Sequence, residues 1–272
     1  MILTDEKLAR LLEPFLARVL IVEPVAASAR LLGDLLKGVG ARQIYLAQTG
    51  FQALNTCKLV DPQVVFTEVG GAERTGLGFV AKLRRSELAC RQAPVIVVTA
   101  EATAAVIVAA RNAGVHEFLR KPFAARDLHR RLEAALLHPR DWIEAVGYVG
   151  PDRRRFNSAD YVGPRKRKAD RVPTSPAGRL EQALKIAKSA VAALESDPAQ
   201  ALRSLQVQTS ELKALAAAMA DARLAAAAGK LQAALAGASV QAGLSRPAIE
   251  AGAADLWAFV VPEPIPTARA VA

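Results

Sequence analysis

The stretch VVFTEVGG, residues 64–71, joins a run of β-branched and aromatic residues to an acid, Glu68, and then to glycines. A short continuous apolar run that ends at turn-forming residues predicts a strand buried on both faces. Glu68 therefore lies at the carboxyl end of an expected buried strand. In open parallel sheets, functional groups collect at these strand ends, so Glu68 is a candidate site residue.

Apolar runs of the same kind recur on both sides of this stretch and alternate with segments of helical periodicity. The expected strands lie at residues 18–22, 43–48, 64–68, 93–100 and 116–123. Each strand is followed by a segment whose apolar residues are spaced as in an amphipathic helix. Uniformly apolar strands that alternate with helices predict an α/β fold with a doubly wound, five-stranded parallel sheet.

Polar residues stand at the carboxyl ends of four expected strands. Glu23 follows the first strand, Glu68 ends the third, Thr99 lies at the end of the fourth, and Lys121 precedes Pro122 in the fifth. Because the carboxyl ends of parallel strands meet at one edge of a sheet, we expect these side chains to gather in one crevice.

Residues 18–138 resemble the receiver domain of response regulators in four stretches. These are RVLIVE at 18–23, QTGFQAL at 48–54, PVIVVTA at 94–100 and KPF at 121–123. The resemblance implies transfer of a phosphoryl group from a histidine kinase to an aspartate after the third strand. It also implies a magnesium ion held by two acids after the first strand and by the acceptor aspartate, with a hydroxyl and a lysine binding the phosphoryl oxygens.

The chain departs from this pattern at several positions. Pro24 stands in place of one acid, Glu68 in place of the acceptor aspartate, and Phe118, at the aromatic switch position, lacks a hydroxyl. Magnesium requires near-octahedral coordination by small oxygen ligands, so we expect a weakened metal site and little or no phosphorylation. The residues of this degenerate site are Glu23, Pro24, Glu68, Thr99, Phe118 and Lys121.

The side chain of Glu68 is longer than that of aspartate, so its carboxylate reaches toward Thr99 and Lys121. A pair between Glu68 and Lys121 would either hold the domain in an activated-like state or serve as an inert buried salt bridge. The sequence leaves both interpretations open.

Composition excludes several classes of protein. The 272 residues suffice for one or two domains, and no apolar run is long enough to span a membrane. Residues 1–17 lack a cationic leader and predict a short amphipathic helix, so we expect a cytoplasmic protein. With two cysteines, and with His116, His129 and His138 expected as surface or strand-end residues, we expect no disulfide framework, metal or cofactor.

Residues 139–178 predict a basic linker with a repeated motif. YVGPDRRR at 148–155 recurs as YVGPRKRK at 161–168, and residues 151–171 hold eight basic residues against three acidic ones. Gly-Pro favours a turn or an extended chain. The basic side chains would bind a nucleic acid, a cyclic dinucleotide or an acidic protein, or they would only keep a flexible tether in solution. They are Arg153, Arg154, Arg155, Arg165, Lys166, Arg167 and Lys168.

Residues 179–260 predict a helical bundle or a dimeric helical hairpin, rich in alanine and leucine. New helices are expected after Asp197, Asp221 and Ser245, because these residues cap helices and proline suits the first helical turn. The proline-rich residues 261–272 are expected to be disordered.

The stretch SELKALAAAMADARLAAAAGKLQAAL, residues 210–235, is similar to the phosphoacceptor region of histidine phosphotransfer (HPt) domains. Leu212-Lys213 and Leu231-Gln232 fit the spacing of that family, but Ser210 stands where the histidine would be. Serine cannot relay a phosphoryl group as imidazole does, so the resemblance implies an inactive phosphotransfer module. A generic bundle or a dimerisation hairpin is the alternative.

These features predict a non-catalytic signal-transduction adaptor rather than an enzyme. By resemblance, its partner is a histidine kinase, another response regulator or a regulated enzyme; a homodimer is a further alternative, and no membrane contact is expected. The docking surface would be the fifth strand and the last receiver helix, where RDLHRRLEAALL at 126–137 presents a basic face. The alternative function is regulation through binding of nucleic acid or a cyclic dinucleotide to the basic linker.

Overall fold

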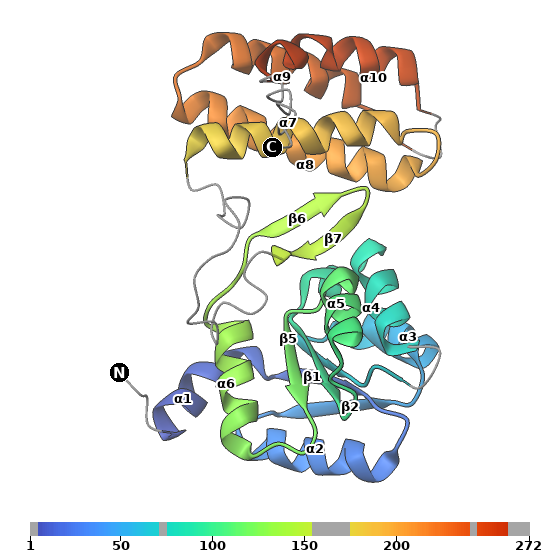
Figure 1. The fold of residues 1–272 in the computed structure, drawn as a ribbon, viewed down its shortest axis with the longest axis vertical. Coiled ribbons are helices and arrows are strands. Elements are labelled where there is room, and N and C mark those ends of the chain that lie inside the picture. The colour runs from blue at the N-terminus through green and yellow to red at the C-terminus, as the bar shows by residue number, and fades with distance from the viewer. Residues whose placement is uncertain (1–4, 71–74, 154–174, 240–243, 261–272) are drawn as a thin grey trace, which may run out of the picture. The chain divides into compact units, whose positions relative to one another are not determined.

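The computed structural model describes residues 5–70, 75–153, 175–239 and 244–260 of the chain. These residues form two compact units (Figure 1). The sheet unit draws on Met1–Ile143 and Tyr148–Arg165, and the helical unit draws on Glu144–Gly147 and Lys166–Ala272. None of the helices in the described ranges combines the length and the apolar character needed to cross a membrane.

The sheet unit is built on the parallel strands β1 (Arg18–Val22), β2 (Gln43–Ala47), β3 (Val64–Thr67), β4 (Val95–Thr99) and β5 (Glu117–Arg120). They hydrogen-bond in the order β2-β1-β3-β4-β5. Strands β3 and β4 are buried at every position, which explains why their sequences are almost entirely apolar. The predicted doubly wound, five-stranded parallel sheet is confirmed.

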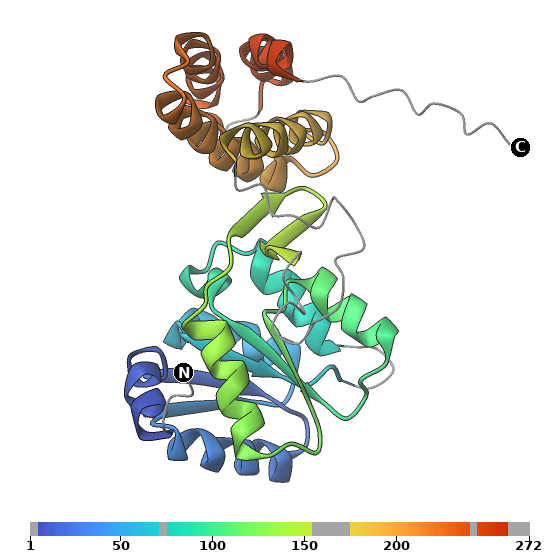
Figure 2. The same cartoon turned by 60° about the vertical axis from the view of Figure 1, so that its left-hand side comes forward.

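Helices cover both faces of this sheet (Figures 1 and 2). One face carries α1 (Asp5–Leu12), α2 (Ala26–Gly38) and α6 (Ala125–Leu136), and the other carries α3 (Gly50–Val60), α4 (Thr75–Arg85) and α5 (Ala104–Ala113). Thr49 and Thr103 cap α3 and α5 by accepting hydrogen bonds from backbone N–H groups. Two 3-10 turns, η1 (Glu13–Phe15) and η2 (Ala89–Gln92), lie just before β1 and β4.

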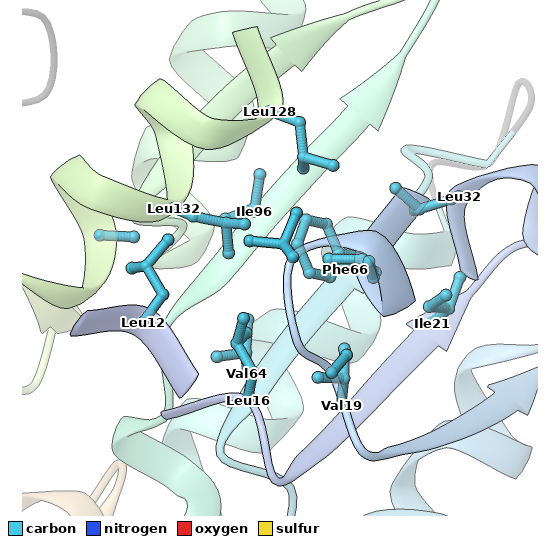
Figure 3. Close-up of a cluster of buried hydrophobic side chains, with 14 of the residues drawn as sticks. Leu12, Leu16, Val19, Ile21, Leu32, Val64, Phe66, Ile96, Leu128 and Leu132 are labelled. Carbon is cyan, nitrogen blue, oxygen red and sulfur yellow. The ribbon is translucent and has the colours of Figure 1, made fainter. Parts of the chain in front are cut away.

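The segment before the first strand is part of the core of this unit (Figure 3). Leu12 and Leu16 are fully buried and belong to the same apolar cluster as Leu132 of α6 and Phe66 of β3. Removing one such leucine side chain from water stabilises the fold by about 2 kcal/mol. Helix α1, which lies within the segment 1–17 where an amphipathic helix was predicted, therefore belongs to the folded sheet unit.

A two-stranded sheet follows α6 and corrects the prediction of a linker from residue 139. Its strands are β6 (Trp142–Ala145) and β7 (Tyr148–Pro151). Strand β7 is the first copy of the YVGP motif, and its four residues are buried, so this copy is a strand and not a turn. Packing requires its Gly150, because a Cβ there would lie 2.8 Å from the Cα of Gly114. The second copy lies outside the described residues.

The helical unit contains α7 (Pro176–Ala192), α8 (Pro198–Ala218), α9 (Ala222–Leu235) and α10 (Arg246–Ala253), followed by the 3-10 helix η5 (Ala254–Phe259). The expected caps of two helices are present, since Asp197 accepts a hydrogen bond from Gln200 N and Asp221 accepts one from Leu224 N. Apolar side chains from all four α-helices form one core. The predicted helical region is confirmed, and residues 261–272 lie outside the described part of the chain.

Candidate functional site

Three predicted site residues follow strands whose carboxyl ends are in register. Glu68 N donates to Val22 O at 2.9 Å, and Lys121 N donates to Thr99 O at 2.8 Å, so both residues continue the backbone ladder beyond β3 and β5. Glu23 directly follows β1, which pairs with β3. The sheet therefore brings these three side chains to one edge.

Lys121 lies between two carboxylates at this edge. Its Nζ lies 2.7 Å from Oε2 of Glu23 and 2.7 Å from Oε2 of Glu68. The second oxygen of each carboxylate accepts a backbone hydrogen bond, from Val25 N at 3.1 Å for Glu23 and from Val69 N at 2.9 Å for Glu68. Every oxygen of the two carboxylates thus has a protein donor. The expected pair of Glu68 with Lys121 is present, and Glu23 completes a set of three charges that we call the edge network.

The edge network is partly shielded from water. The exposed fraction of the side chain is 8% for Glu23, 18% for Glu68 and 28% for Lys121. Burial by itself lowers the pKa of Lys121, but hydrogen bonds and attraction from the two carboxylates outweigh burial and raise that pKa. Lys121 is therefore an ammonium ion at neutral pH.

Comparisons with known proteins agree with the fold of the sheet unit. The profile of the response regulator receiver domain matches residues 19–133. Chemotaxis protein CheY-3 of Vibrio cholerae is 30% identical over 116 residues, which are 43% of this chain and 88% of that protein. The chain belongs to the response regulator receiver family.

Two further proteins are similar over comparable lengths. Chemotaxis protein CheY1 of Helicobacter pylori is 28% identical over 120 residues, which are 44% of this chain and 96% of that protein. A solved structure of Vibrio cholerae chemotaxis protein CheY4 is 23% identical, has a TM-score of 0.41, and is matched over 44% of this chain and 99% of its own. Each of these matches spans less than half of the chain, so they concern the receiver domain alone.

The other predicted positions of the receiver site engage different groups. Thr99 is buried, and its hydroxyl accepts a hydrogen bond from Glu101 N at 3.2 Å. Phe118 is half-buried and packs against the apolar cluster beneath α3, α4 and α5. Pro24 is exposed and offers no side-chain ligand. Of the six predicted positions, Glu23, Glu68 and Lys121 form the edge network.

The geometry of this receiver edge does not fit the magnesium ion that the family resemblance implies. Pro24 supplies no carboxylate, and each oxygen of Glu23 and Glu68 already accepts a hydrogen bond. A magnesium ion needs octahedral oxygen ligands and would here face the ammonium group of Lys121. Within the described ranges, no group of three or more His, Cys, Asp or Glu side chains forms a metal site.

Helix α4 approaches the receiver edge beside Glu68. A Cβ at Gly76 would lie 1.8 Å from the carbonyl oxygen of Glu68 and 2.8 Å from Oγ1 of Thr67. Glycine therefore lets the first turn of α4 contact the end of β3. Gly76 was not among the predicted site residues, and the signal for it was the glycine-containing stretch TGLG at 75–78.

A groove of about 300 Å³ lies beside β5, on the predicted docking surface of the receiver domain. Ile107, Phe118 and Phe123 contribute apolar side chains to its lining. The charged residues of its lining are Arg120, Asp127, Arg130 and Arg131. The groove thus combines an apolar surface with charged groups that are mainly basic.

Arg84 of α4 forms the centre of a buried polar cluster that the sequence did not suggest. It is 1% exposed. Its guanidinium donates to the carbonyl oxygens of Gly114 at 3.0 Å, Arg91 at 2.5 Å and Ala93 at 2.9 Å. It also lies 5.3 Å from the centre of the Trp142 ring on β6. One side chain therefore joins α4, the η2 region, the end of α5 and β6.

His116 is a buried residue directly before β5, at the strand end where it was expected. Its Nδ1 accepts a hydrogen bond from Val95 N at 3.2 Å and faces Nη2 of Arg84 at 3.2 Å. Burial first, and then the charges of Arg84 and Arg140, lower the pKa of His116 well below its ordinary value. The imidazole is therefore neutral, with its proton on Nε2.

The predicted HPt-like positions line one groove in the helical unit. Ser210 is exposed on α8, and its hydroxyl donates to Gln206 O at 3.1 Å. Lys213 donates to Oε1 of Gln232 on α9 at 2.6 Å. Ser210, Lys213 and Gln232 belong to the lining of a groove of about 450 Å³.

The basic segment is described only as far as Arg153. Its guanidinium donates to Oδ1 of Asn112 at 3.0 Å and lies 4.3 Å from the centre of the Tyr148 ring. Arg153 is thus bound within the sheet unit. The other predicted contact residues, which lie outside the described residues, are Arg154, Arg155, Arg165, Lys166, Arg167 and Lys168.

Proposed function

We propose that this chain is a receiver-type signal-transduction adaptor that binds a protein partner without being phosphorylated and without catalysing a reaction. The observation that carries the proposal is the edge network, in which Glu23 and Glu68 both hold Lys121 at 2.7 Å. By family resemblance, this lysine binds the transferred phosphoryl group. Here the carboxylate of Glu68, which is part of the chain itself, takes the place of that phosphoryl group beside Lys121.

The edge network needs no ligand to be complete. Glu68 supplies, through its own side chain, the negative charge that phosphorylation would otherwise place beside Lys121. The raised pKa of Lys121 keeps the ion pair intact at neutral pH. The receiver domain would therefore keep one activated-like state, and a partner that recognises this state would bind without a phosphorylation signal.

Two features of Glu68 support the absence of phosphorylation. Both of its carboxylate oxygens accept hydrogen bonds, from Val69 N and from Lys121, which hold the carboxylate in one orientation and oppose its realignment for in-line attack on a phosphodonor. The site also does not fit magnesium, which would neutralise the phosphoryl charge. Phosphoryl transfer depends on in-line positioning and on this charge neutralisation.

The groove beside β5 supports a protein partner with an acidic, partly apolar docking segment. Phe118 and Phe123 would contact an apolar side chain, while Arg120 and Arg130 would attract carboxylates. A histidine kinase, another response regulator, a regulated cytoplasmic enzyme or a second copy of the chain would satisfy this chemistry.

The helical unit would act as an HPt-like interaction module that lacks the phosphoaccepting histidine. The exposed position of Ser210 on α8, beside Lys213 and within a groove, supports this assignment. A serine hydroxyl that donates to Gln206 O has no basic nitrogen to accept a phosphoryl group. The module would bind rather than transfer.

The alternative function assigned to the basic segment stays a prediction. Arg153 is engaged with Asn112 and Tyr148, and the remaining basic residues lie outside the described part of the chain. Binding of nucleic acid or a cyclic dinucleotide therefore receives no specific support from the described geometry.

Intact-mass spectrometry after incubation with acetyl phosphate and magnesium tests the absence of phosphorylation. We expect the wild-type chain to gain no phosphoryl group. A Pro24→Asp/Glu68→Asp variant restores the two carboxylate positions, and we expect it to gain one. A phosphoryl group on Glu68 of the wild-type chain would contradict the proposal.

Affinity capture from nuclease-treated lysate tests the adaptor role. We expect the full chain and a chain without residues 154–171 to retain the same protein partner, because this deletion spares β7. Arg120→Glu reverses a charge in the groove and should release that partner, whereas Lys82→Glu on α4 should not. A partner that is lost only with residues 154–171 would favour the alternative function.

A further inference from the structure

The two cysteines of the chain meet inside the sheet unit. Cys57 lies on α3 and Cys90 lies in the 3-10 turn η2. The Sγ of Cys90 donates to the carbonyl oxygen of Cys57 at 3.8 Å. Both side chains belong to the same apolar cluster, with residues 2% and 4% exposed. The fold therefore brings the free thiol of Cys90 against the backbone of the second free cysteine, Cys57, although the two residues are distant in sequence.

We propose that Cys57 and Cys90 form a peroxide-reactive dithiol that closes to an intramolecular disulfide. This inference goes beyond the proposed adaptor function and does not depend on it. Its basis is the direct contact of α3 and η2 through the two cysteines, in a chain that has no other cysteine.

The environment of the pair assigns different roles to the two sulfurs. The thiol of Cys90 contacts the backbone of Cys57, and the interaction between the two side chains lowers the pKa of Cys90 while it raises the pKa of Cys57. The buried guanidinium of Arg84 acts in the same direction on Cys90. We assign the attack on the oxidant to Cys90, because it lies in the short turn η2, whereas Cys57 lies inside α3 and would act as the resolving thiol.

Hydrogen peroxide is the oxidant of the proposed reaction. The Cys90 thiolate attacks one peroxide oxygen, the O–O bond breaks, and sulfenic acid and hydroxide form. The sulfur of Cys57 then attacks the sulfenic sulfur, gives up its proton and displaces hydroxide, which leaves as water. In sum, two thiols and one peroxide yield one disulfide and two waters.

Access to Cys90 requires only local motion. Its turn η2 is four residues long, and the first and last residues of this turn, Ala89 and Gln92, are exposed. Opening of η2 must break the hydrogen bonds that Arg84 donates to Arg91 O and Ala93 O, but it leaves the strands of the sheet in place. Peroxide is small and uncharged, so a brief opening of η2 suffices for it to enter.

The disulfide would enclose the segment that carries Glu68. Between Cys57 and Cys90 the chain contains β3, Glu68 and α4. A covalent link between α3 and η2 would therefore restrain both ends of this segment. For a loop of this length, we expect the sheet unit to unfold at a Tm about 5–15 °C higher than in the reduced protein.

Peptide mapping of the full-length protein tests the proposal. The native protein is treated with hydrogen peroxide, the peroxide is removed with catalase, and remaining thiols are alkylated during denaturation in acid. Trypsin releases Cys57 in residues 43–58 and Cys90 in residues 86–91. We expect these two peptides as one disulfide-linked species, which separates after treatment with dithiothreitol, together with loss of both titratable thiols.

Three outcomes would overturn the proposal. In the first, both thiols are still free after peroxide treatment and are found alkylated. In the second, Cys90 is oxidised to sulfinic acid and no disulfide forms. In the third, the disulfide joins two chains instead of Cys57 and Cys90 of one chain. Cys57→Ser and Cys90→Ser are the matched controls, and neither should show the Tm increase. Because the wild-type peptide map is decisive by itself, a variant that fails to fold leaves the test intact.

Discussion

The ammonium group of Lys121 holds together two carboxylates that would otherwise repel each other. Glu23 and Glu68 reach the same Nζ from different strands, each at 2.7 Å. The three side chains are at most 28% exposed, so water screens their charges only in part. Loss of this ammonium group therefore costs more than loss of an exposed ion pair, which is worth about 0–1 kcal/mol.

We predict that Lys121→Met lowers the free energy of unfolding of the sheet unit by about 2 kcal/mol, because Glu23 and Glu68 lose their shared donor. Urea unfolding measures this change. Lys82→Met on the exposed face of α4 is the control, with an expected change below about 0.5 kcal/mol. Equal losses of unfolding free energy for the two substitutions would contradict the prediction that the edge network stabilises the sheet unit.

A neutral, buried imidazole makes the sheet unit less stable in acid. The unfolded chain protonates His116 near pH 6.5, whereas the folded pKa lies well below this value. The unfolded state thus binds the extra proton, so stability is complete above about pH 6.5 and falls by about 1.4 kcal/mol per pH unit below it. The charges that face His116 are Arg84 of α4 and Arg140 after α6.

His116→Asn isolates this contribution, because Asn offers an acceptor oxygen in place of Nδ1 but does not titrate. We predict that the wild type loses its stability advantage over His116→Asn as the pH falls from 7 to 5.5. Urea midpoints measured across this range provide the test. A difference that does not change with pH would show that His116 does not bind the proton.

Residue types alone predicted part of the edge network. The pair of Glu68 with Lys121 followed from strands whose carboxyl ends meet, and it is present. The contact of Glu23 with Lys121 was not predicted, because an acid after the first strand equally suits a metal. Which partner the carboxylate takes depends on side-chain reach and distance, and these are set by the folded backbone.

At the scale of elements, the packing of helix α4 requires glycine at position 76 but not at position 78. We predict that Gly76→Ala destabilises the sheet unit by at least about 2 kcal/mol, since the added Cβ would lie 1.8 Å from Glu68 O. Gly78→Ala on the same helix meets no atom within 4 Å and should stabilise by up to about 1 kcal/mol. Thermal unfolding of both variants checks these opposite signs.

Arg84 connects several elements through hydrogen bonds that a lysine cannot reproduce. We predict that Arg84→Lys destabilises the sheet unit by about 3 kcal/mol, because buried carbonyl oxygens of Gly114, Arg91 and Ala93 lose donors. The neighbouring Arg85→Lys, on an exposed side chain, should change stability by less than about 0.5 kcal/mol. If both variants unfold at the same urea concentration, the buried hydrogen bonds of Arg84 do not add the expected stability.

The sequence predicted most elements but misjudged β7. Helix caps such as Thr49 and Asp197 act locally, so short motifs reveal them. The YVGP motif is compatible with both a turn and an extended strand. Burial of Tyr148 and the close approach of Gly150 to Gly114 decide for the strand, and these contacts come from residues far away in sequence.

At the scale of the whole molecule, each unit has its own apolar core. Leu231 is fully buried in the helical unit, where much of the surrounding core is alanine. We predict that Leu231→Ala destabilises the helical unit by about 3 kcal/mol through cavity formation, without changing exchange protection of β3 and β4. Hydrogen exchange resolves the two units, and Gln232→Ala is the exposed control. Loss of protection in β3 would contradict separate cores.

The two-part organisation was readable from the change from alternating strands to alanine-rich helices. The extent of the first part was not, because residues 142–151 precede the basic run and their Gly-Pro pair equally favours a turn or an extended chain. Their membership in the folded structure rests on contacts with α4 and α5, such as Trp142 with Arg84. Long-range contacts of this kind leave no periodic trace in a single sequence.

The path of the chain through the two-stranded sheet of β6 and β7 also bears on how the gene for such a chain can recombine. The chain leaves the sheet unit after Ile143 and returns to it at Tyr148. A recombination event that fused a new module directly after α6 would separate Arg84 from Trp142 and Gly114 from Gly150. A crossover that keeps these contacts would lie after β7, so β6 and β7 would be inherited with the sheet unit, including the residues 144–147 that belong to the helical unit.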